Sequence, residues 1–291
     1  MTTIRDGPLP QHMADVAQAF VPGHVTGFFT ADRNPDPTKA GSRGAGIALS
    51  DGVTVTVRVA DSVSVVLNGE EIEMEAVQRV LDALEVQGEV RGVTDLPLGS
   101  GFGVSGAMAL GSALATNQAF DRRLSRNELV TIAHGAEVQA GTGLGDVVAQ
   151  AHGGVPIRLE PGGPQDNFLD AIPTRGRIEY NVVGELSTDD VLSESTDEIT
   201  EAGKKALSEV VSEPTIQRFM RASRTFSRES DLLTPAVHEV ITDVTEAGGN
   251  AAMAMLGETV FSLGTGLSDA GYDPAVCGVH PAGATIETEF D

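Results

Sequence analysis

The sequence predicts a protein of mixed helices and strands that is divided into two domains. Its 291 residues can bury a sizeable core, and a domain usually contains about 100–200 residues. Segments with β-type and with helical apolar spacing occur in both halves of the chain. Between the halves, Pro161-Gly162-Gly163 closes a short predicted strand, and such residues are typical of a border. We therefore expect one domain at residues 1–160 and a second at 161–291.

The first half opens with β-type segments, and helical segments and further strands follow. Within residues 43–67, valines alternate with polar side chains and an Asn-Gly turn pair follows, which predicts two neighbouring strands of one half-buried sheet. Helical spacing of apolar residues follows at 74–86, and a strand is expected at 89–93. Residues 1–15 show little periodicity, so order should begin near Val16.

Two helices are predicted after a glycine-rich loop. Residues 105–120 are rich in Ala, Leu and Met, which predicts a largely buried helix. Ser125 and Glu128 have the spacing of a capping box, so the second helix begins at Ser125 and ends at Gly141. The remaining predictions are strands at 155–160, 177–183, 251–256 and 258–263 and helices at 188–211, 214–229 and 235–247.

The charge balance limits the classes of partner. The chain has 42 acidic and 19 basic residues, a formal net charge of −23. Such a surface repels nucleic acid and anionic membranes, so we expect neither as a partner. The scarcity of lysine beside abundant Asp and Glu resembles proteins that work in concentrated salt, where charges are screened. We therefore hypothesise a halophilic host.

Cysteine usage and hydropathy indicate a soluble, cytoplasmic protein. Cys277 is the single cysteine of the sequence and cannot form an internal disulfide, which fits a reducing compartment. The sequence shows neither a charged-then-apolar leader nor a run of about 18 apolar residues. We therefore expect neither export nor membrane spanning.

The segment at residues 97–107 (PLGSGFGVSGA) follows a predicted strand and opens a predicted helix. Its glycines let backbone N–H groups approach a phosphate, and the helix N-terminus adds partial positive charge. The spacing Gly101-x-Gly103-x-x-Gly106 also fits a dinucleotide fingerprint, and a glycine-rich turn can be a simple tight turn. A second helix follows instead of a strand ending in an acid, which argues against a dinucleotide site. The absence of Gly-Lys-Ser/Thr excludes a Walker P-loop.

The same segment resembles the phosphate-binding motif of the GHMP kinase superfamily. VPGH at 21–24 and GGNA at 248–251 resemble that superfamily's first and last motifs, in the same order along the chain. The resemblance therefore covers nearly the whole sequence. Three runs look most like archaeal pantoate kinases: residues 22–29 (PGHVTGFF), 101–107 (GFGVSGA) and 143–150 (GLGDVVAQ).

This resemblance implies a two-domain α+β fold, with an N-terminal half like domain 2 of ribosomal protein S5 and a ferredoxin-like C-terminal half. It implies a kinase that uses ATP and Mg²⁺ to phosphorylate a hydroxyl of pantoate for coenzyme A biosynthesis, and it implies a homodimer. The residues expected to contact the nucleotide are Pro97, Gly99, Ser100, Gly101, Gly103, Ser105, Gly106 and Ala107.

The resemblance also assigns catalytic roles. Asp146, in the run GLGD, lies where mevalonate-type relatives carry their catalytic aspartate, so we expect it to act as general base or to orient the hydroxyl. A helix N-cap is the alternative role. Glu137 resembles the family's magnesium-binding glutamate, with Ser105 as its hydroxyl partner. Ser100 could replace Ser105 as the metal ligand.

Four further residues are expected near the acceptor. Pantoate needs a cation for its carboxylate, and Arg158 is the candidate, because arginine binds carboxylates through two hydrogen bonds. His134 precedes Glu137 by three residues and shares its helix face, so it is a candidate substrate contact or a core histidine. Thr26 could bind a substrate oxygen. His24 departs from the lysine or arginine that often follows Pro-Gly in the superfamily, which weakens Asp146 as a strong base.

Two alternative functions remain open at this point. Another GHMP kinase, acting on homoserine, shikimate or mevalonate, is the first, although homoserine kinases generally lack the aspartate that Asp146 would supply. A nucleotide-binding module without catalysis is the second. The combination of Ser105, Glu137 and Asp146 argues against it, because a pure binder needs no base.

Overall fold

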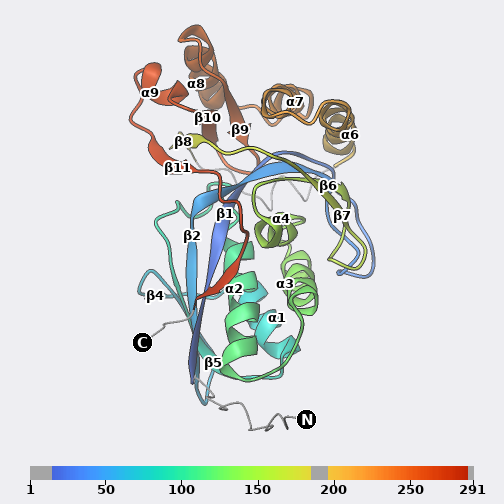
Figure 1. Ribbon diagram of the computed structural model, residues 1–291, viewed down its shortest axis with the longest axis vertical. Helices are drawn as coiled ribbons and strands as arrows, with labels where there is room; N and C mark the ends of the chain where they lie inside the picture. The colour runs from blue at the N-terminus through green and yellow to red at the C-terminus, as the bar shows by residue number, and fades with distance from the viewer. Residues whose placement is uncertain (1–14, 185–195, 288–291) are drawn as a thin grey trace, which may run out of the picture.

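The computed structural model describes residues 15–184 and 196–287 and contains two sheets with helices packed against them (Figure 1). The first sheet has eight strands in the order β12-β1-β2-β5-β3-β4, with β6 paired to β2 and β7 paired to β6. Its strands are β1 (Val16–Phe29), β2 (Gly44–Val59), β3 (Ser64–Leu67), β4 (Glu70–Glu71), β5 (Gly88–Val93), β6 (Val155–Glu160), β7 (Phe168–Ile172) and β12 (Thr285–Glu287). Its helices are α1 (Glu75–Ala83), α2 (Val104–Ala119), α3 (Arg126–Ala140) and α4 (Asp146–His152).

The second sheet has four strands in the order β11-β8-β10-β9. In Figure 1 it lies above the first sheet, with α7 and α8 beside it and α6 next to α7. Its strands are β8 (Arg177–Val182), β9 (Ala251–Ala254), β10 (Thr259–Leu263) and β11 (Ala275–Gly278). The helices of this half are α6 (Asp197–Ser212), α7 (Ile216–Glu229), α8 (Pro235–Glu246) and the short α9 (Gly266–Asp269).

Helix α2 forms the centre of the first half. Thirteen of its sixteen residues are buried, as predicted from its Ala- and Leu-rich composition. The helix packs directly on β1 and β2. At Gly111 the approach is so close that a Cβ would lie 2.5 Å from the Val55 side chain. The small residues of α2 therefore let the helix sit against the sheet and fix the position of its N-terminus.

Aromatic side chains join the two halves into one core. The rings of Phe28 and Phe219 lie 6.1 Å apart, and those of Phe29 and Phe226 lie 5.6 Å apart. Phe219 also contacts Phe261 on β10. Because these rings come from β1, α7 and β10, the apolar interior continues from one sheet to the other.

Several predicted elements are confirmed. Residues 1–14, for which no order was expected, lie outside the described residues. The helices at α1, α2, α3, α7 and α8 lie within a few residues of their predicted ranges, and Ser125 and Glu128 form the predicted capping box at α3. Gly141 ends α3 with φ of 73°. The predicted helix at 188–211 corresponds to α6, although its first part, up to residue 195, lies outside the described residues.

Other expectations are wrong or incomplete. The two strands within residues 43–67 are not neighbours, because β5 lies between β2 and β3 and pairs with both. The strands β1, β4, β7, β11 and β12 and the helices α4 and α9 were not predicted. The boundary after residue 160 stays a prediction, although strand pairing assigns β7 and β12, which lie beyond it, to the first sheet.

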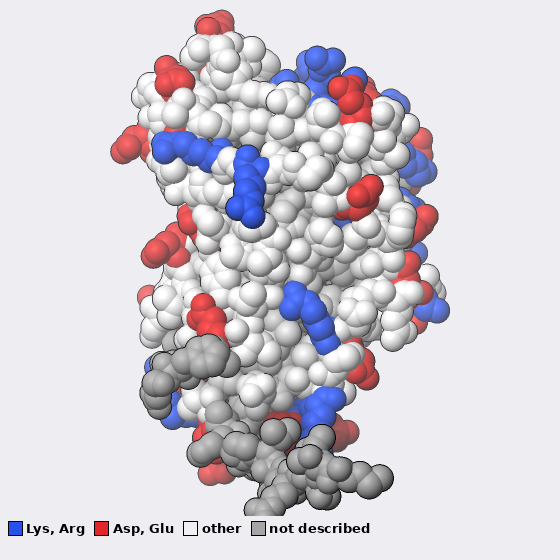
Figure 2. Space-filling view, in the orientation of Figure 1, with Lys and Arg blue, Asp and Glu red and all other residues white. Residues whose placement is uncertain are grey.

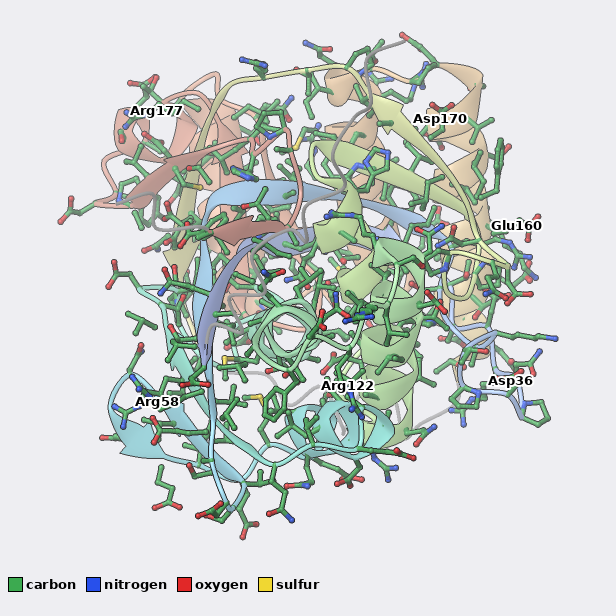
Figure 3. All side chains as sticks on the ribbon, turned by 60° about the horizontal axis from the view of Figure 1, so that its bottom comes forward. Asp36, Arg58, Arg122, Glu160, Asp170 and Arg177 are labelled. Atoms are coloured by element: carbon green, nitrogen blue, oxygen red, sulfur yellow. The ribbon has the colours of Figure 1, made fainter. Side chains whose placement is uncertain are left out.

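Apart from the buried Glu137, Arg158 and Glu179, the Asp, Glu, Lys and Arg side chains of the described residues are at least partly exposed. On the face shown in Figure 2, acidic groups are spread over the molecule instead of forming one block. Labelled side chains such as Asp36, Arg58 and Arg177 lie at the periphery in Figure 3. None of the helices within the described residues is long and apolar enough to cross a membrane.

Candidate active site

The glycine-rich loop leads into the N-terminus of α2. Gly99, Gly101 and Gly103 have positive φ angles of 69°, 83° and 65°, a backbone conformation that favours glycine. Gly103 is the N-cap of α2, and its carbonyl accepts the first intrahelical bond, from Ala107 at 2.9 Å. The N–H groups of the first turn precede that bond and are available to an anion. We call residues 97–107 the phosphate loop.

Elements of both halves hold the phosphate loop in place. The hydroxyl of Thr259 on β10 donates to the carbonyl of Ser100 at 2.8 Å. The backbone N–H of His24 on β1 donates to the carbonyl of Phe102 at 2.9 Å. Gly257 lies so close to Ser100 that a Cβ there would be 2.2 Å from its carbonyl oxygen. The loop is therefore fixed from the β1 side and from the second sheet.

A cavity of about 280 Å³ opens at this loop. Its walls come from β1, the phosphate loop, the turn before α4, β6 and the turn after β9. The lining residues are Thr26, Phe29, Ser42, Gly99, Gly101, Phe102, Gly103, Val104, Ser105, Thr142, Gly143, Leu144, Gly145, Asp146, Arg158, Met255 and Leu256.

Glu137 is a buried carboxylate behind the start of α2. Its Oε1 accepts hydrogen bonds from the hydroxyl of Ser105 at 2.5 Å and from that of Thr142 at 2.8 Å. Burial raises the pKa of Glu137 to about 7, against the lowering effect of these two bonds. Its Oε2 lies 2.5 Å from the position of a Cβ on Gly143, and Asp146 Oδ2 lies 3.5 Å from the same point. The two carboxylates thus flank Gly143.

Asp146 is the first residue of α4 and is joined to His24. Asp146 Oδ1 and His24 Nδ1 lie 2.7 Å apart, with the His24 side chain fully buried and that of Asp146 26% exposed. Burial lowers the pKa of His24, whereas the Asp146 carboxylate opposes that shift. Burial alone would raise the pKa of Asp146, but the His24 hydrogen bond and the charge of Arg158 hold it below its usual value. The N-cap of α4 is Gly145, so Asp146 is not a helix cap.

Arg158 is a buried cation at the cavity. Its Nε donates to the carbonyl of Ser42 at 3.3 Å, and its Nη1 is buried without a hydrogen-bond partner among the described residues. Burial lowers the pKa of Arg158 to about 10, partly opposed by Asp146. A guanidinium with an unmet donor beside a cavity suits an anionic ligand group, because unpaired buried donors are costly.

The structure brings some of the other predicted residues to the cavity and not others. Thr26 lines it, and its Oγ1 lies 3.4 Å from His24 Nδ1. His134 is buried, its Nε2 faces the Ala40 carbonyl at 2.8 Å, and it is not among the lining residues. The hydroxyl of Ser100 donates to the carbonyl of Leu98. Three further predicted nucleotide contacts do not line the cavity: Pro97, Gly106 and Ala107.

Sequence reasoning missed several residues of the cavity. Thr142 bonds Glu137, and Ser42 lies beside Arg158. Met255 and Leu256 form the wall contributed by the second half. Thr142 could have been suspected, because it lies next to the GLGD run, whereas the others come near the site only through strand pairing and tertiary packing.

Comparison with known proteins defines the class to which this fold and site belong. Residues 71–154, which include the phosphate loop, match the family model of the GHMP kinases N terminal domain. A solved structure described as a phosphotransferase related to the CoA biosynthesis pathway is 30% identical, with a TM-score of 0.83. The match covers 94% of this chain and 98% of that one. The predicted two-domain α+β fold of the GHMP kinases is confirmed.

Two curated relatives define the family more closely. A pantoate kinase of Thermococcus kodakarensis is 36% identical over 265 residues, covering 84% of this chain and 87% of that protein. A pantoate kinase of Methanocaldococcus jannaschii is 32% identical over 252 residues, covering 84% of this chain and 91% of that protein. The chain belongs to the pantoate kinase family of the GHMP kinase superfamily.

Proposed function

We propose that this protein transfers the γ-phosphoryl group of ATP to a hydroxyl of pantoate, giving 4-phosphopantoate for coenzyme A biosynthesis. The family relationship supports this activity. The observation that carries the proposal is the meeting of the N-terminus of α2, the carboxylate of Asp146 and the guanidinium of Arg158 in one cavity. A phosphoryl transfer needs these three functions: phosphate binding, an oriented hydroxyl and a held acceptor.

Mg²⁺ fits the oxygen donors beside the phosphate loop. The Ser105 hydroxyl and the Glu137 carboxylate are hard ligands, and Mg²⁺ commonly takes one or two such groups together with substrate phosphates and water. Ser105 is favoured over Ser100, because only Ser105 lines the cavity and bonds Glu137. When bound, the ion would neutralise charge on the phosphates.

Asp146 would accept the proton of the acceptor hydroxyl or orient that hydroxyl. The lowered pKa of His24 keeps its ring neutral near pH 7, so that ring holds Asp146 by a hydrogen bond rather than by a full cation. The carboxylate is ionised at that pH, because its own pKa is lowered. We infer that much of the rate comes from the fixed placement of the hydroxyl relative to the phosphate.

Arg158 would bind the carboxylate of pantoate. Arg158 and Asp146 both line the cavity, and they lie close enough for each to shift the pKa of the other. A carboxylate bound to Arg158 therefore places the rest of a small acceptor within reach of Asp146. His134 stays a prediction as a second substrate contact, although neither it nor the neighbouring Gly41 lines the cavity.

An acceptor screen tests the proposal. ATP-dependent ADP release is measured with pantoate, mevalonate, homoserine and shikimate in high KCl. All four acceptors carry a carboxylate that Arg158 could pair, so discrimination must come from where each places its hydroxyl relative to Asp146. We expect pantoate to have a kcat/KM at least about tenfold above the others, because a misplaced hydroxyl reacts slowly. Equal turnover of all four, or turnover of none, would reject the proposal.

A further inference from the structure

Gln150 is a buried amide between α4 and the phosphate loop. It follows Asp146 by four residues, so both side chains project from one face of α4. Its side chain is fully buried, and Nε2 donates to the carbonyl oxygen of Gly103 at 2.9 Å. Gly103 is the N-cap of α2. The Gln150 side chain therefore links α4, which carries Asp146, to Gly103, which directly precedes the α2 N–H groups proposed to bind phosphate.

The amide fits closely against the first turn of α2. A Cβ on Gly103 would lie 3.1 Å from Gln150 Nε2, and a Cβ on Gly106 would lie 3.0 Å from Gln150 Oε1. The same Cβ on Gly103 would lie 3.3 Å from Asp146 Cβ. A side chain larger than hydrogen would therefore not fit at Gly103 or Gly106 unless a neighbour moved by a few tenths of an ångström, so these glycines let α4 pack close to the phosphate loop.

The orientation of the amide is fixed by its partner. Reversing it would turn Oε1 toward the Gly103 carbonyl and bring two acceptors together. In the observed orientation Oε1 is buried without a hydrogen-bond partner among the described residues. An unmet buried carbonyl is unfavourable for stability, so an apolar side chain of similar size would serve a purely structural contact better.

We propose that Gln150 is a positioning residue, which fixes the separation between Asp146 and the phosphate loop. The inference rests on the proposed function, in which Asp146 holds the acceptor and the loop holds the phosphoryl donor. An error of about 1 Å in such an arrangement can lower the rate by about 10²-fold. Binding of each substrate alone depends much less on this separation.

The first test replaces the donor while keeping volume. In Gln150→Met we expect kcat to fall at least about tenfold, with the KM values for ATP and pantoate within about threefold of wild type. Gln217→Met makes the same change at an exposed position of α7 and should leave kcat unchanged. Circular dichroism and thermal unfolding establish that both variants are folded.

The second test replaces the amide by a carboxyl group, which can donate a hydrogen bond only when it is protonated. In Gln150→Glu the ionised carboxylate cannot donate to Gly103, whereas the protonated acid can. The ratio of variant to wild-type kcat should therefore rise at least about tenfold between pH 8.5 and pH 6. Helix α4 itself carries Asp146, and the elements packed against it contribute His24, His134, Glu137 and Arg158. These groups are present in both proteins, so most of their effect cancels in the ratio.

The outcomes separate this inference from the proposed function. A folded Gln150→Met with wild-type kcat, or a ratio for Gln150→Glu that does not change with pH, rejects the positioning role while the wild-type activity stands. A selective loss of kcat together with recovery at low pH supports it. Failure of the wild type to phosphorylate pantoate in the same assay rejects the proposed function and this inference with it.

Discussion

At the scale of single residues, Glu137 carries a carboxyl group that burial makes difficult to ionise. Its pKa is raised from 4.5 to about 7, so the folded protein binds a proton more tightly than the unfolded chain. The resulting stabilisation is fully present below pH 4.5 and is lost as the pH rises through 7. The nucleotide-free protein therefore retains an unfavourable buried charge at pH 8.

We predict that Glu137→Gln stabilises the nucleotide-free protein by about 1–3 kcal/mol at pH 8 and removes most activity. The amide cannot ionise, but its oxygen still accepts from Ser105 and Thr142. Urea unfolding at pH 8 and pH 5 measures the difference, which should be much smaller at pH 5. An equal effect at both pH values would contradict the assigned pKa shift.

Arg158 provides the second prediction at this scale. Arg158→Lys keeps the charge and loses the planar pair of donors, so we expect KM for pantoate to rise about 10–100-fold with KM for ATP nearly unchanged. Steady-state kinetics measure both constants. Arg43→Lys is the matched control, because Arg43 pairs with Asp32 and Glu160 and does not line the cavity. A rise in both KM values for Arg158→Lys would instead indicate general damage to the site.

At the residue scale, sequence reasoning located residues of the cavity where the signal was local. The phosphate loop and Asp146 were recognised from contiguous motifs, and both lie at the cavity. The hydrogen bond between His24 and Asp146 joins residues 122 positions apart, and Arg158 meets Ser42 across 116 positions. Such contacts depend on strand pairing and burial, which no local pattern specifies.

At the scale of elements, the entry into α2 depends on glycine. In Gly103→Ala we expect KM for ATP to rise at least about fivefold and stability to fall by about 1–2 kcal/mol, because φ of 65° is unfavourable for alanine. The new methyl group would also press against Gln150 and Asp146. ATP titrations and urea unfolding measure the two effects.

Gly99→Ala is the control for that prediction. Gly99 has a similar φ of 69°, but a Cβ there meets no atom within 4 Å. The change therefore adds backbone strain without the contacts to α4, and its effect on stability should be smaller. If Gly99→Ala were the more damaging of the two, close packing at Gly103 would not explain the role of that residue.

The failure to predict β1 and α4 from the sequence has identifiable causes. Strand β1 contains Pro22 and Gly23, which normally end regular structure, and the structure accommodates them at a shift in register between Pro22 and His24. Helix α4 has only seven residues, too few to show helical periodicity. By contrast, α2 and α3 carried composition and capping signals strong enough to identify them.

At the scale of the whole molecule, the net charge of −23 is the dominant feature. Self-repulsion of this surface opposes the compact state, and salt relieves it because the Debye length falls to about 3 Å at 1 M. We predict that the midpoint of thermal unfolding rises by at least about 10 °C between 0.1 and 3 M KCl. Sorbitol at matched water activity is the non-ionic control, and a midpoint independent of KCl would contradict the halophilic hypothesis.

The two halves of the molecule meet at the site, which makes catalysis a property of the complete fold. The phosphate loop and both carboxylates come from the first half, whereas Thr259, Met255 and Leu256 of the second half hold the loop and complete the cavity wall. The measurement that tests the central claim most directly compares turnover and ATP binding in wild type and Asp146→Asn. The account predicts that kcat with pantoate falls about 10²–10⁴-fold while the Kd for ATP stays within about threefold. Unchanged turnover in Asp146→Asn would contradict it.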